Sequence, residues 1–334
     1  MFKEKYLNKQ KDLSAKNITP PFPKIIKIDI CNVCNYSCVF CPQARQHNKI
    51  GCIDKDLCYS IIKDSYNAGA RELCLSMTGE PLLNMELENY VRYAKAIGYT
   101  YVFLNTNGYL LNEERTERLL SAGIDSVKVS VNAARKSYQV VHGVDAFDRV
   151  IENIKKFSEI KQQKRYSCSL YVSYIALKPT LEEAGLIKEI LASYVDEIVV
   201  MNANTRGGSV YEEKSKIYIG EDEFSFQYPC SQLFNNAYVT AEGYMIICCQ
   251  DFENLTVVAD LHRENIVDAW NNKIFTDFRR KYLSHDLTGT LCQNCIYNTS
   301  EEVVPLIKEK AYYETSTSKE IDLLKRIKEL EAHC

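Results

Sequence analysis

Short apolar, β-branched segments alternate with longer amphipathic segments through the first two-thirds of the chain. This alternation predicts a parallel sheet whose strands are joined by right-handed helical crossovers. Six strand–helix units are too few to close an eight-stranded barrel, so we expect an α/β fold with a partial (β/α)6 TIM-like barrel. The expected strands span 24–30, 72–78, 99–106, 125–131, 168–175 and 197–202, and the expected helices span 54–69, 86–97, 112–122, 145–160 and 180–193.

The alternation stops after about residue 205. The segment 236–249 has the pattern of a hairpin that turns at Glu242 and Gly243, and 265–283 has that of one helix. A tight turn is expected at 291–295 and a polar helical tail from 301, with Thr317 and Glu320 spaced as a capping box before an apolar stripe over 321–330. The expected parts are an N-terminal extension (1–22), the barrel (23–205), a linker (206–229), a small α+β domain (230–298) and the helical tail (299–334).

Polar segments follow each expected strand in turn. In barrels of this kind the carboxyl ends of the strands and the loops after them carry the chemistry. We therefore expect one site on that face. The segments are the cysteine-rich stretch 31–42, then 78–81, 106–108, Ser130 with Asn132, Lys178 and Arg206.

The composition is ordinary apart from the cysteines. The 334 residues are 46% hydrophobic and 25% charged, and a net charge of −3 gives no indication of a nucleic-acid partner. The first ten residues lack the apolar core of a secretory signal, and no run approaches the ~18 apolar residues of a membrane span. We expect a cytoplasmic protein without a membrane partner, in which 14 cysteines favour metal or redox chemistry over disulfides.

The first cysteine group suits a cluster better than a zinc ion. A zinc ribbon separates its two CxxC pairs by about 15–20 residues, and Cys31-x2-Cys34 lies only three residues before Cys38-x2-Cys41. The C-x2-C-x2-C run of a bacterial ferredoxin is also missing. The spacing of Cys34, Cys38 and Cys41 would let a short loop bind three irons of one cubane, which leaves the fourth iron without a protein ligand.

This stretch resembles the CX3CX2C signature of the radical S-adenosylmethionine (radical SAM) superfamily, which has an aromatic residue before its third cysteine. The resemblance implies a [4Fe–4S] cluster on Cys34, Cys38 and Cys41, with Cys31 outside the ligand set. S-adenosylmethionine would then chelate the fourth iron.

Later segments extend the resemblance. Residues 78–81 resemble the family's GGEP segment, which holds the methionyl amino group, although a threonine replaces the first glycine. Residues 105–107 and 130–132 are similar to strand ends that approach the methionine and ribose. The implied contacts to S-adenosylmethionine are Phe40, Thr78, Gly79, Glu80, Asn105, Thr106, Asn107, Ser130 and Asn132.

A second cysteine group lies late in the chain. Four cysteines could also form a structural zinc site, but the spacing resembles the SPASM or Twitch domains that follow many radical SAM barrels. After the final CX2C pair no cysteine follows until Cys334, so the resemblance implies one auxiliary [4Fe–4S] cluster. At one position Cys249 is an alternative to Cys248 as the ligand. The implied ligands are Cys230, Cys248, Cys292 and Cys295.

The resemblance also implies a reaction. Reductive cleavage of S-adenosylmethionine would give a 5′-deoxyadenosyl radical that removes hydrogen from the substrate. Single-auxiliary-cluster members include a dehydrogenase of an amino-cyclitol antibiotic precursor, which favours oxidation of an alcohol in a small polyol, sugar or cyclitol, with the auxiliary cluster as electron acceptor. The expected partners are that small molecule and a flavodoxin or ferredoxin-type electron donor. Candidate catalytic residues are Lys178, Arg206 and Asp251.

Three alternatives stay open. A peptide-modifying maturase is disfavoured because about 23 residues precede the first strand and a second auxiliary cysteine set is missing. An epimerase would need a thiol hydrogen donor, for which Cys74 and Cys168 are candidates on strand segments. An electron carrier or a zinc-stabilised binding protein would not need the 78–81 segment.

Overall fold

The six expected parallel strands are present in the computed structural model, which describes residues 17–45, 51–210, 216–219, 228–312, 322 and 325–330. Each strand pairs in parallel with the next along the chain, which confirms the α/β fold and its crossovers. The strands are β1 (Ile25–Ile28), β2 (Glu72–Cys74), β3 (Tyr101–Thr106), β4 (Ser126–Ser130), β5 (Ser169–Ala176) and β6 (Glu197–Asn202).

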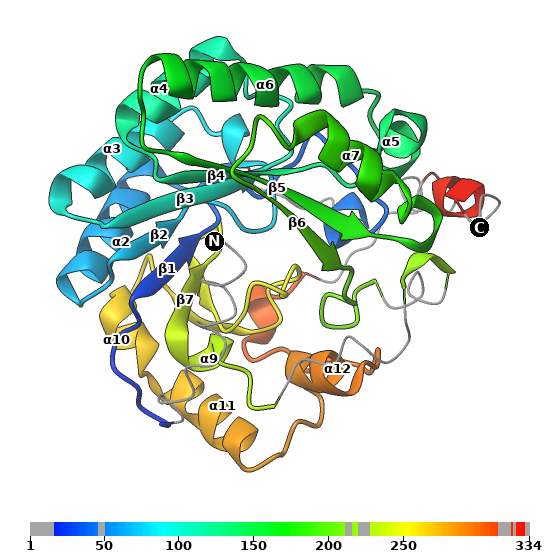
Figure 1. Cartoon of the computed structure of the whole chain (residues 1–334). Coiled ribbons are helices and arrows are strands. Elements are labelled where there is room, and N and C mark those ends of the chain that lie inside the picture. The colour runs from blue at the N-terminus through cyan, green and yellow to red at the C-terminus, as the bar shows by residue number, and fades with distance from the viewer. Residues whose placement is uncertain are drawn as a thin grey trace.

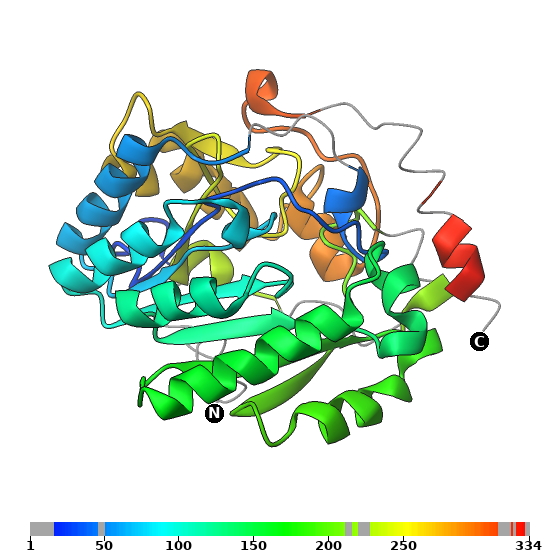
Figure 2. The ribbon, with the colours of Figure 1, turned by 90° about the horizontal axis from the view of Figure 1, so that it is seen from above.

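Helices cover the outer face of the curved sheet, as Figures 1 and 2 show from two directions. Asp54 and Asn112 cap the amino ends of α2 and α4, and Gly98 ends α3 in the left-handed conformation. One helix, α5, was not predicted, because it has only eight residues and no side-chain cap. The helices are α2 (Lys55–Asn67), α3 (Leu87–Ile97), α4 (Glu113–Ala122), α5 (Arg135–His142), α6 (Phe147–Gln163) and α7 (Glu183–Leu191).

The two faces of the sheet differ in character. Successive side chains of a strand point to opposite faces. Ile26 and Val127 are fully buried in the core between the sheet and its helices. Their neighbours Lys27 and Lys128 point the other way and stay partly exposed. The outer face therefore supplies the core, and the concave face is left for polar chemistry.

The C-terminal hairpin belongs to the same sheet. Strand β7 (Asn236–Val239) pairs in parallel with β1, and β8 (Tyr244–Ile246) and β9 (Val257–Asp260) follow in antiparallel order. The nine-stranded order is β6-β5-β4-β3-β2-β1-β7-β8-β9, so the barrel is open between β6 and β9 (Figure 1). The turn expected at Gly243 is confirmed, with a φ of 81° that favours glycine. The domain boundaries at 205 and 230 stay predictions.

Two local predictions in this region were wrong. The helix expected over 265–283 is divided into α10 (Ile266–Trp270) and α11 (Lys273–Leu283), because the side chain of Asn272 accepts a hydrogen bond from Phe275 N at 2.9 Å and starts a new helix. The turn expected at 291–295 is the first part of α12 (Leu291–Tyr297), whose amino end is capped by Thr290. A short helix, α9 (Gln232–Asn235), precedes β7.

The helical tail is present only in part. Within 301–312 the structure has a single 3-10 turn, η4 (Lys308–Lys310). The backbone N–H groups of Val304 and Leu306 instead donate to the carbonyls of Gly289 and Leu255, each at 2.9 Å, so this segment pairs with other loops. Residues 325–330 are helical, as expected. The predicted capping box at 317–320 lies outside the described residues.

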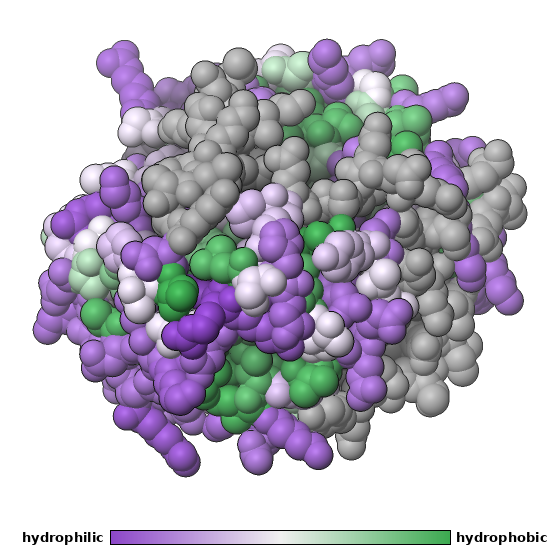
Figure 3. Space-filling model, turned by 90° about the horizontal axis from the view of Figure 1, so that it is seen from below, coloured by the Kyte–Doolittle hydropathy of each residue, from purple (hydrophilic) through white to green (hydrophobic). Residues whose placement is uncertain are grey.

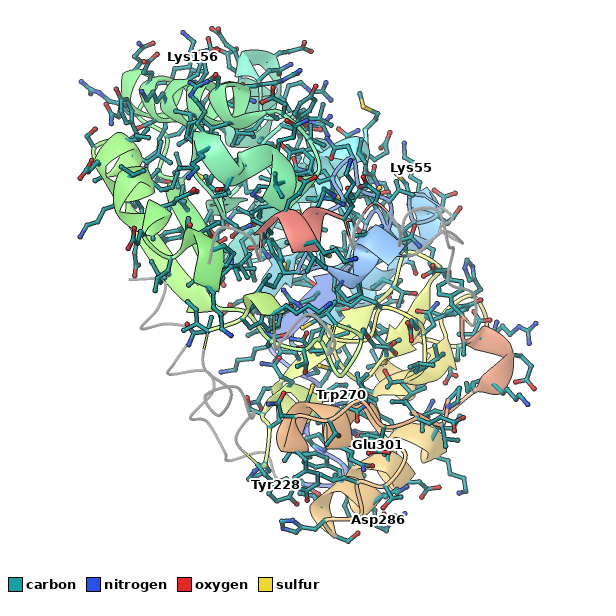
Figure 4. The ribbon with its side chains drawn as sticks, turned by 90° about the vertical axis from the view of Figure 1, so that its right-hand side faces the viewer. Lys55, Lys156, Tyr228, Trp270, Asp286 and Glu301 are labelled. Atoms are coloured by element: carbon teal, nitrogen blue, oxygen red, sulfur yellow. The ribbon has the colours of Figure 1, made fainter. Side chains whose placement is uncertain are left out.

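A buried arginine joins the N-terminal stretch to the C-terminal helices. The guanidinium of Arg279 is fully buried between the rings of Trp270 and Phe275 and donates to Trp270 O at 2.9 Å and Leu233 O at 3.2 Å. The indole N–H of Trp270 donates to Pro20 O at 3.0 Å. Figure 4 shows Trp270 in this lower part of the molecule, whereas Lys55 and Lys156 lie on the helices above.

Where Figure 3 colours the surface seen from below, hydrophilic side chains surround separate apolar clusters. Among the described residues, none of the helices combines the length and the apolar character needed to cross a bilayer.

We predict that Arg279→Met lowers the melting temperature of the reconstituted protein by several degrees. The substitution leaves buried carbonyls without a donor, which costs roughly 3 kcal/mol. Arg280→Met on the same helix is the control, because Arg280 is exposed and pairs with exposed Asp277. Anaerobic thermal unfolding measures both variants, and equal melting temperatures would contradict the role given to Arg279.

Candidate functional site

The first cysteine group lies on the loop between β1 and the 3-10 turn η1 (Pro42–Arg45). Cys34, Cys38 and Cys41 are all partly exposed there. The pKa of the Cys38 thiol is raised well above its usual value, first by burial and then by the Cys41 and Cys34 thiols. The three sulfurs therefore oppose one another's ionisation, and a bound cationic iron cluster would remove that conflict. The donor set thus fits an iron–sulfur cluster.

The turn after β2 packs directly against this loop. A Cβ atom on Gly79 would lie 2.2 Å from Cys31 O and 2.5 Å from Val33 O, so no other residue fits without moving the loop. The N–H of Glu80 donates to Val33 O at 2.9 Å. The predicted segment 78–81 therefore holds the cysteine loop in place.

Glu80 presents a buried carboxylate beside the cysteines. It accepts hydrogen bonds from Thr106 Oγ1 at 2.6 Å, Asn107 N at 2.8 Å and Leu82 N at 3.1 Å. Burial raises its pKa, although these hydrogen bonds act in the opposite direction. Burial, followed by the charge of Glu80, raises the pKa of Cys34 to about 12. A carboxylate in this position would favour a cation such as the ammonium group of S-adenosylmethionine.

Asparagine side chains connect further strand ends. Asn107 Nδ2 donates to Asn35 Oδ1 in the cysteine loop at 2.8 Å. Asn132, at the end of β4, accepts from Ile175 N at 2.8 Å. Its own N–H donates to Nε2 of His142 at 3.2 Å, which places the imidazole proton on Nδ1, 3.1 Å from Cys38 Sγ.

His142 was missed by the sequence analysis. It comes from α5, the helix that the hydrophobic pattern did not reveal. Its ring is fully buried, which lowers its pKa to about 3 and keeps it neutral. A neutral imidazole that donates to Cys38 and accepts from Asn132 links the cysteine loop to β4.

Four further residues were predicted to contact S-adenosylmethionine: Phe40, Thr78, Asn105 and Ser130. Phe40 is buried, with its ring 6.2 Å from that of His142. The hydroxyl of Thr78 donates to Asp29 at the end of β1. Asn105 and Ser130 lie on the concave face and are partly exposed, and the hydroxyl of Ser130 is 3.4 Å from that of Ser173.

The second cysteine group comes from three segments: the turn before α9, the end of β8 and the helix α12. Cys292 and Cys295 share one face of α12 because they are three residues apart. The pKa of Cys292 is raised well above its usual value by burial, then by Cys295 and Cys230. The pKa of Cys248 is likewise raised, first by a hydrogen bond to Cys249 and then by burial, with further contributions from Cys295 and Cys230. These four predicted ligands therefore lie near one another.

Cys249 lies beside the same group. A hydrogen bond between its thiol and that of Cys248 lowers the pKa of Cys249, and its charge acts on Cys230 and Cys295. It also packs against Tyr238 of β7, whereas Cys248 packs against the main core with Cys230 and Cys292. The choice of Cys248 over Cys249 as the ligand stays a prediction.

The described ranges contain no site for a single metal ion, because no three thiol, imidazole or carboxylate groups in them are placed to bind one.

The three candidate catalytic residues have different surroundings. Lys178, in the turn η3 (Lys178–Thr180), is exposed. Arg206 is partly exposed and donates to Gln250 Oε1 at 3.3 Å. Asp251 is buried, and its two oxygens accept hydrogen bonds from Glu253 N at 3.0 Å and from Thr256 N at 2.7 Å. Two of the three lie beside the second cysteine group: the N–H of Asp251 donates to Cys248 O at 3.2 Å, and the charge of Arg206 acts on Cys295.

An arginine near the end of the chain also reaches the first cysteine group. Arg326 is buried and donates to Ser37 O at 2.8 Å, to Ser37 Oγ at 3.1 Å and to Val140 O at 3.4 Å. The helix at 325–330 lies beside α5 in Figures 1 and 2. Nothing in the local sequence around Arg326 predicted this contact, because Ser37 and Val140 are 289 and 186 positions away in the chain.

The matches to family models cover both cysteine groups. Residues 28–183 match the radical SAM superfamily, and residues 230–296 match the SPASM iron-sulfur cluster-binding domain. The chain therefore belongs to the radical SAM superfamily and carries a SPASM-type domain. It uses S-adenosylmethionine and two [4Fe–4S] clusters, one that binds S-adenosylmethionine and one auxiliary.

Individual relatives are similar over part of the chain. A probable GTP 3′,8-cyclase of Saccharolobus islandicus is 35% identical over 136 residues, which are 40% of this chain and 44% of that protein. The chain thus spans about half the length of the curated relatives that it matches. A second probable GTP 3′,8-cyclase, from Sulfurisphaera tokodaii, is 29% identical over 184 residues, or 54% of this chain and 56% of its own.

Solved structures share the fold at low identity. BtrN in complex with AdoMet and 2-DOIA has a TM-score of 0.55 at 21% identity, covering 85% of this chain and 97% of BtrN. Streptococcus suis SuiB bound to the precursor peptide SuiA has a TM-score of 0.64 at 15% identity, covering 80% of this chain and 69% of SuiB. These likenesses confirm the partial-barrel fold.

We predict that Gly79→Ala lowers the iron bound after anaerobic reconstitution by about half. The added methyl group overlaps two carbonyls of the cysteine loop, so it displaces the three thiols from one another. Gly185→Ala is the control, since a Cβ there meets nothing within 4 Å. Unchanged iron and sulfide content in the Gly79 variant would show that this contact does not position the loop.

We also predict that Arg326→Ala increases the rate of amide hydrogen exchange across residues 35–41. Removal of the guanidinium frees Ser37 O and Ser37 Oγ, which hold the loop to the C-terminal helix. Lys328→Ala on the exposed side of the same helix is the matched control. Exchange that is equally slow in both variants would argue against the contact.

Proposed function

We propose that this enzyme oxidises an alcohol of a small polyol, sugar or cyclitol by radical chemistry. The observation that supports this most is the presence of two separate groups of cysteines beside one sheet. The first group follows β1, and the second lies around the hairpin that begins with β7, the parallel partner of β1. A second, fully ligated cluster gives such an enzyme an electron acceptor that a redox-neutral radical reaction does not need.

The first site would hold a cluster on Cys34, Cys38 and Cys41. A reduced cluster there supplies the electron that cleaves S-adenosylmethionine and yields the 5′-deoxyadenosyl radical. The protein binds and orients the reactants around this event. Glu80 would receive the methionyl ammonium group, while Asn107 and Asn132 fix the strand ends beside it.

The second site would hold the auxiliary cluster on Cys230, Cys248, Cys292 and Cys295, where it supplies the electron acceptor. The substrate loses a hydrogen atom from its carbinol carbon, then the hydroxyl proton and one electron. The product ketone is therefore two hydrogens lighter than the substrate. A flavodoxin or ferredoxin-type protein is the proposed source of the electron that starts each turnover.

The relatives leave the substrate open. The names and titles given to them mention GTP, 2-DOIA and a precursor peptide. We favour a small molecule over a peptide because the chain carries one auxiliary set of cysteines.

An epimerase is the second candidate. Cys74 is in register with Lys27 and therefore shares the concave face with it, where a thiol could return hydrogen to the substrate. Cys168 does not favour it. The groups that act on the Cys168 thiol include Lys161, Asp125 and Asp196, which lie at the amino ends of the strands, away from the cysteine loop.

The first test counts iron and zinc per chain after anaerobic reconstitution. Two [4Fe–4S] clusters give about eight irons, falling to about four in the Cys34/Cys38/Cys41 triple alanine variant and to about four in Cys292→Ala/Cys295→Ala. The triple variant is expected to form no 5′-deoxyadenosine with S-adenosylmethionine and a strong reductant. Cys52→Ala, which removes an exposed thiol, is the control.

Other results would overturn parts of the proposal. About four irons with one zinc would make the second site structural and remove the electron acceptor. A product that has the mass of the substrate in ordinary water and gains one deuterium in heavy water would favour the epimerase. Absence of 5′-deoxyadenosine in the wild type would contradict the radical reaction itself.

A further inference from the structure

Backbone hydrogen bonds on both sides of Cys38 fix this cysteine to the carboxyl end of α5. The N–H of Ser37 donates to His142 O at 3.1 Å, and the N–H of Val39 donates to Val141 O at 2.9 Å. The main chain therefore brings the sulfur of Cys38 and the imidazole of His142 together. Their contact, 3.1 Å from Sγ to Nδ1, is not needed to hold the loop on the helix.

The hydrogen bonds of His142 determine which ring nitrogen carries the proton. Its Nε2 is 3.2 Å from the backbone nitrogen of Asn132, and this N–H can only donate, so Nε2 is the acceptor. The proton of the neutral imidazole is then on Nδ1. A cysteine that binds iron does so as a thiolate, which has no proton of its own to donate. The hydrogen bond therefore runs from Nδ1 to Cys38 Sγ.

Aromatic rings enclose the imidazole of His142. Its centroid is 4.3 Å from that of Tyr138, 5.6 Å from that of Tyr36 and 6.2 Å from that of Phe40. His142 is 1% exposed, so its ring is shielded from bulk water. A hydrogen bond to a charged acceptor is stronger in such low-dielectric surroundings than in water.

The donors at Cys34 are further from their sulfur. The N–H of Tyr36 donates to Cys34 Sγ at 3.4 Å, and Asn107 Nδ2 lies 3.9 Å from the same atom. Asn107 Nδ2 also donates to Asn35 Oδ1 at 2.8 Å, so its hydrogens are shared. Of these two sulfurs, Cys38 thus has the closer donor.

We infer that His142 raises the reduction potential of the cluster that binds S-adenosylmethionine. One electron from the flavodoxin or ferredoxin-type donor enters this cluster without a proton and increases the negative charge on the thiolate sulfurs. The N–H of Nδ1 stabilises that charge on Cys38, so it favours the reduced form over the oxidised form. His142 acts through Cys38 and is therefore a positioning residue. The inference rests on the proposed function, which makes Cys38 an iron ligand.

The test is a redox titration of the anaerobically reconstituted holoenzyme, followed by electron paramagnetic resonance. The signal that changes when S-adenosylmethionine is added reports the first cluster, and the other signal reports the auxiliary cluster. His142→Phe keeps an aromatic ring among its neighbours but removes the donor. At a given potential it is expected to raise the ratio of oxidised to reduced first cluster about ten-fold, which is a midpoint about 59 mV lower for a one-electron couple. The auxiliary midpoint is expected to stay unchanged.

His142→Asn separates the hydrogen bond to sulfur from the contact with Asn132. The amide nitrogen of asparagine is as many bonds from the main chain as Nδ1 is, so it still donates to Cys38, but no atom replaces Nε2. The N–H of Asn132 therefore loses its acceptor in both variants. His142→Asn is expected to keep a midpoint close to that of the wild type. An equal fall in both variants would assign the effect to Asn132 and overturn the inference.

Tyr138→Phe is the matched control on the same helix. It removes another buried polar group of α5, a hydroxyl that is 3.2 Å from Tyr36 Oη. Its midpoint for the first cluster is expected to match that of the wild type. A wild-type midpoint in His142→Phe as well, or an equal fall in Tyr138→Phe, would overturn the inference.

A second measurement keeps the inference testable if His142→Phe fails to bind the first cluster. Wild-type protein that contains histidine labelled with heavy nitrogen is reduced without S-adenosylmethionine and studied by pulsed electron paramagnetic resonance. A hyperfine coupling between an imidazole nitrogen and a reduced cluster is expected, and His142→Asn is expected to remove it. Absence of the coupling in the wild type, or its persistence in His142→Asn, would overturn the inference.

Failure of this inference differs from failure of the proposed function. If Cys38 binds no iron, the Cys34/Cys38/Cys41 triple alanine variant keeps about eight irons. If Cys38 is a ligand and His142 has no electronic role, the iron content of the triple variant falls as proposed while the midpoints of the wild type and His142→Phe coincide.

Discussion

The parallel pairing of β1 with β7 is the constraint on which the rest of the molecule depends. Four residues of each strand are in register, from Ile25 with Asn236 to Ile28 with Val239. The first cysteine group leaves the end of β1, and the second lies around the hairpin that β7 begins. Because neighbouring strands are fixed about 4.8 Å apart, two segments some 200 residues apart in sequence become parts of one rigid frame.

That frame holds ionisable side chains whose arrangement is electrostatically unfavourable while no ligand is bound. The thiols of the first cysteine group raise one another's pKa, and the carboxylate of Glu80 is buried beside them. Each conflict would be relieved by a ligand of opposite charge: iron for the thiols and an ammonium group for the carboxylate. The fold offsets these costs with its core, in which the outer residues of β1 to β5 are fully buried against the helices.

The sequence predicted those features that repeat along the chain or that depend on local spacing. All six strands of the barrel and the close placement of residues 34–41 with residues 79, 80 and 107 follow from periodicity and from strand-end motifs. His142 and Arg326 could not be found in this way. His142 lies on a helix of eight residues, and Arg326 acts through contacts between distant segments that leave no local pattern. The helix at 291–297 was missed because two cysteines and an asparagine in seven residues have little helix propensity.

The contact between Arg326 and Ser37 spans 289 positions of the chain. Translation at about 5–20 residues per second would separate the synthesis of its two partners by roughly 15 to 60 seconds. During that interval the cysteine loop already exists, but the side chain that closes it against α5 does not. Until Arg326 has been synthesised, the loop therefore lacks the side chain that joins Ser37 to α5 in the finished protein.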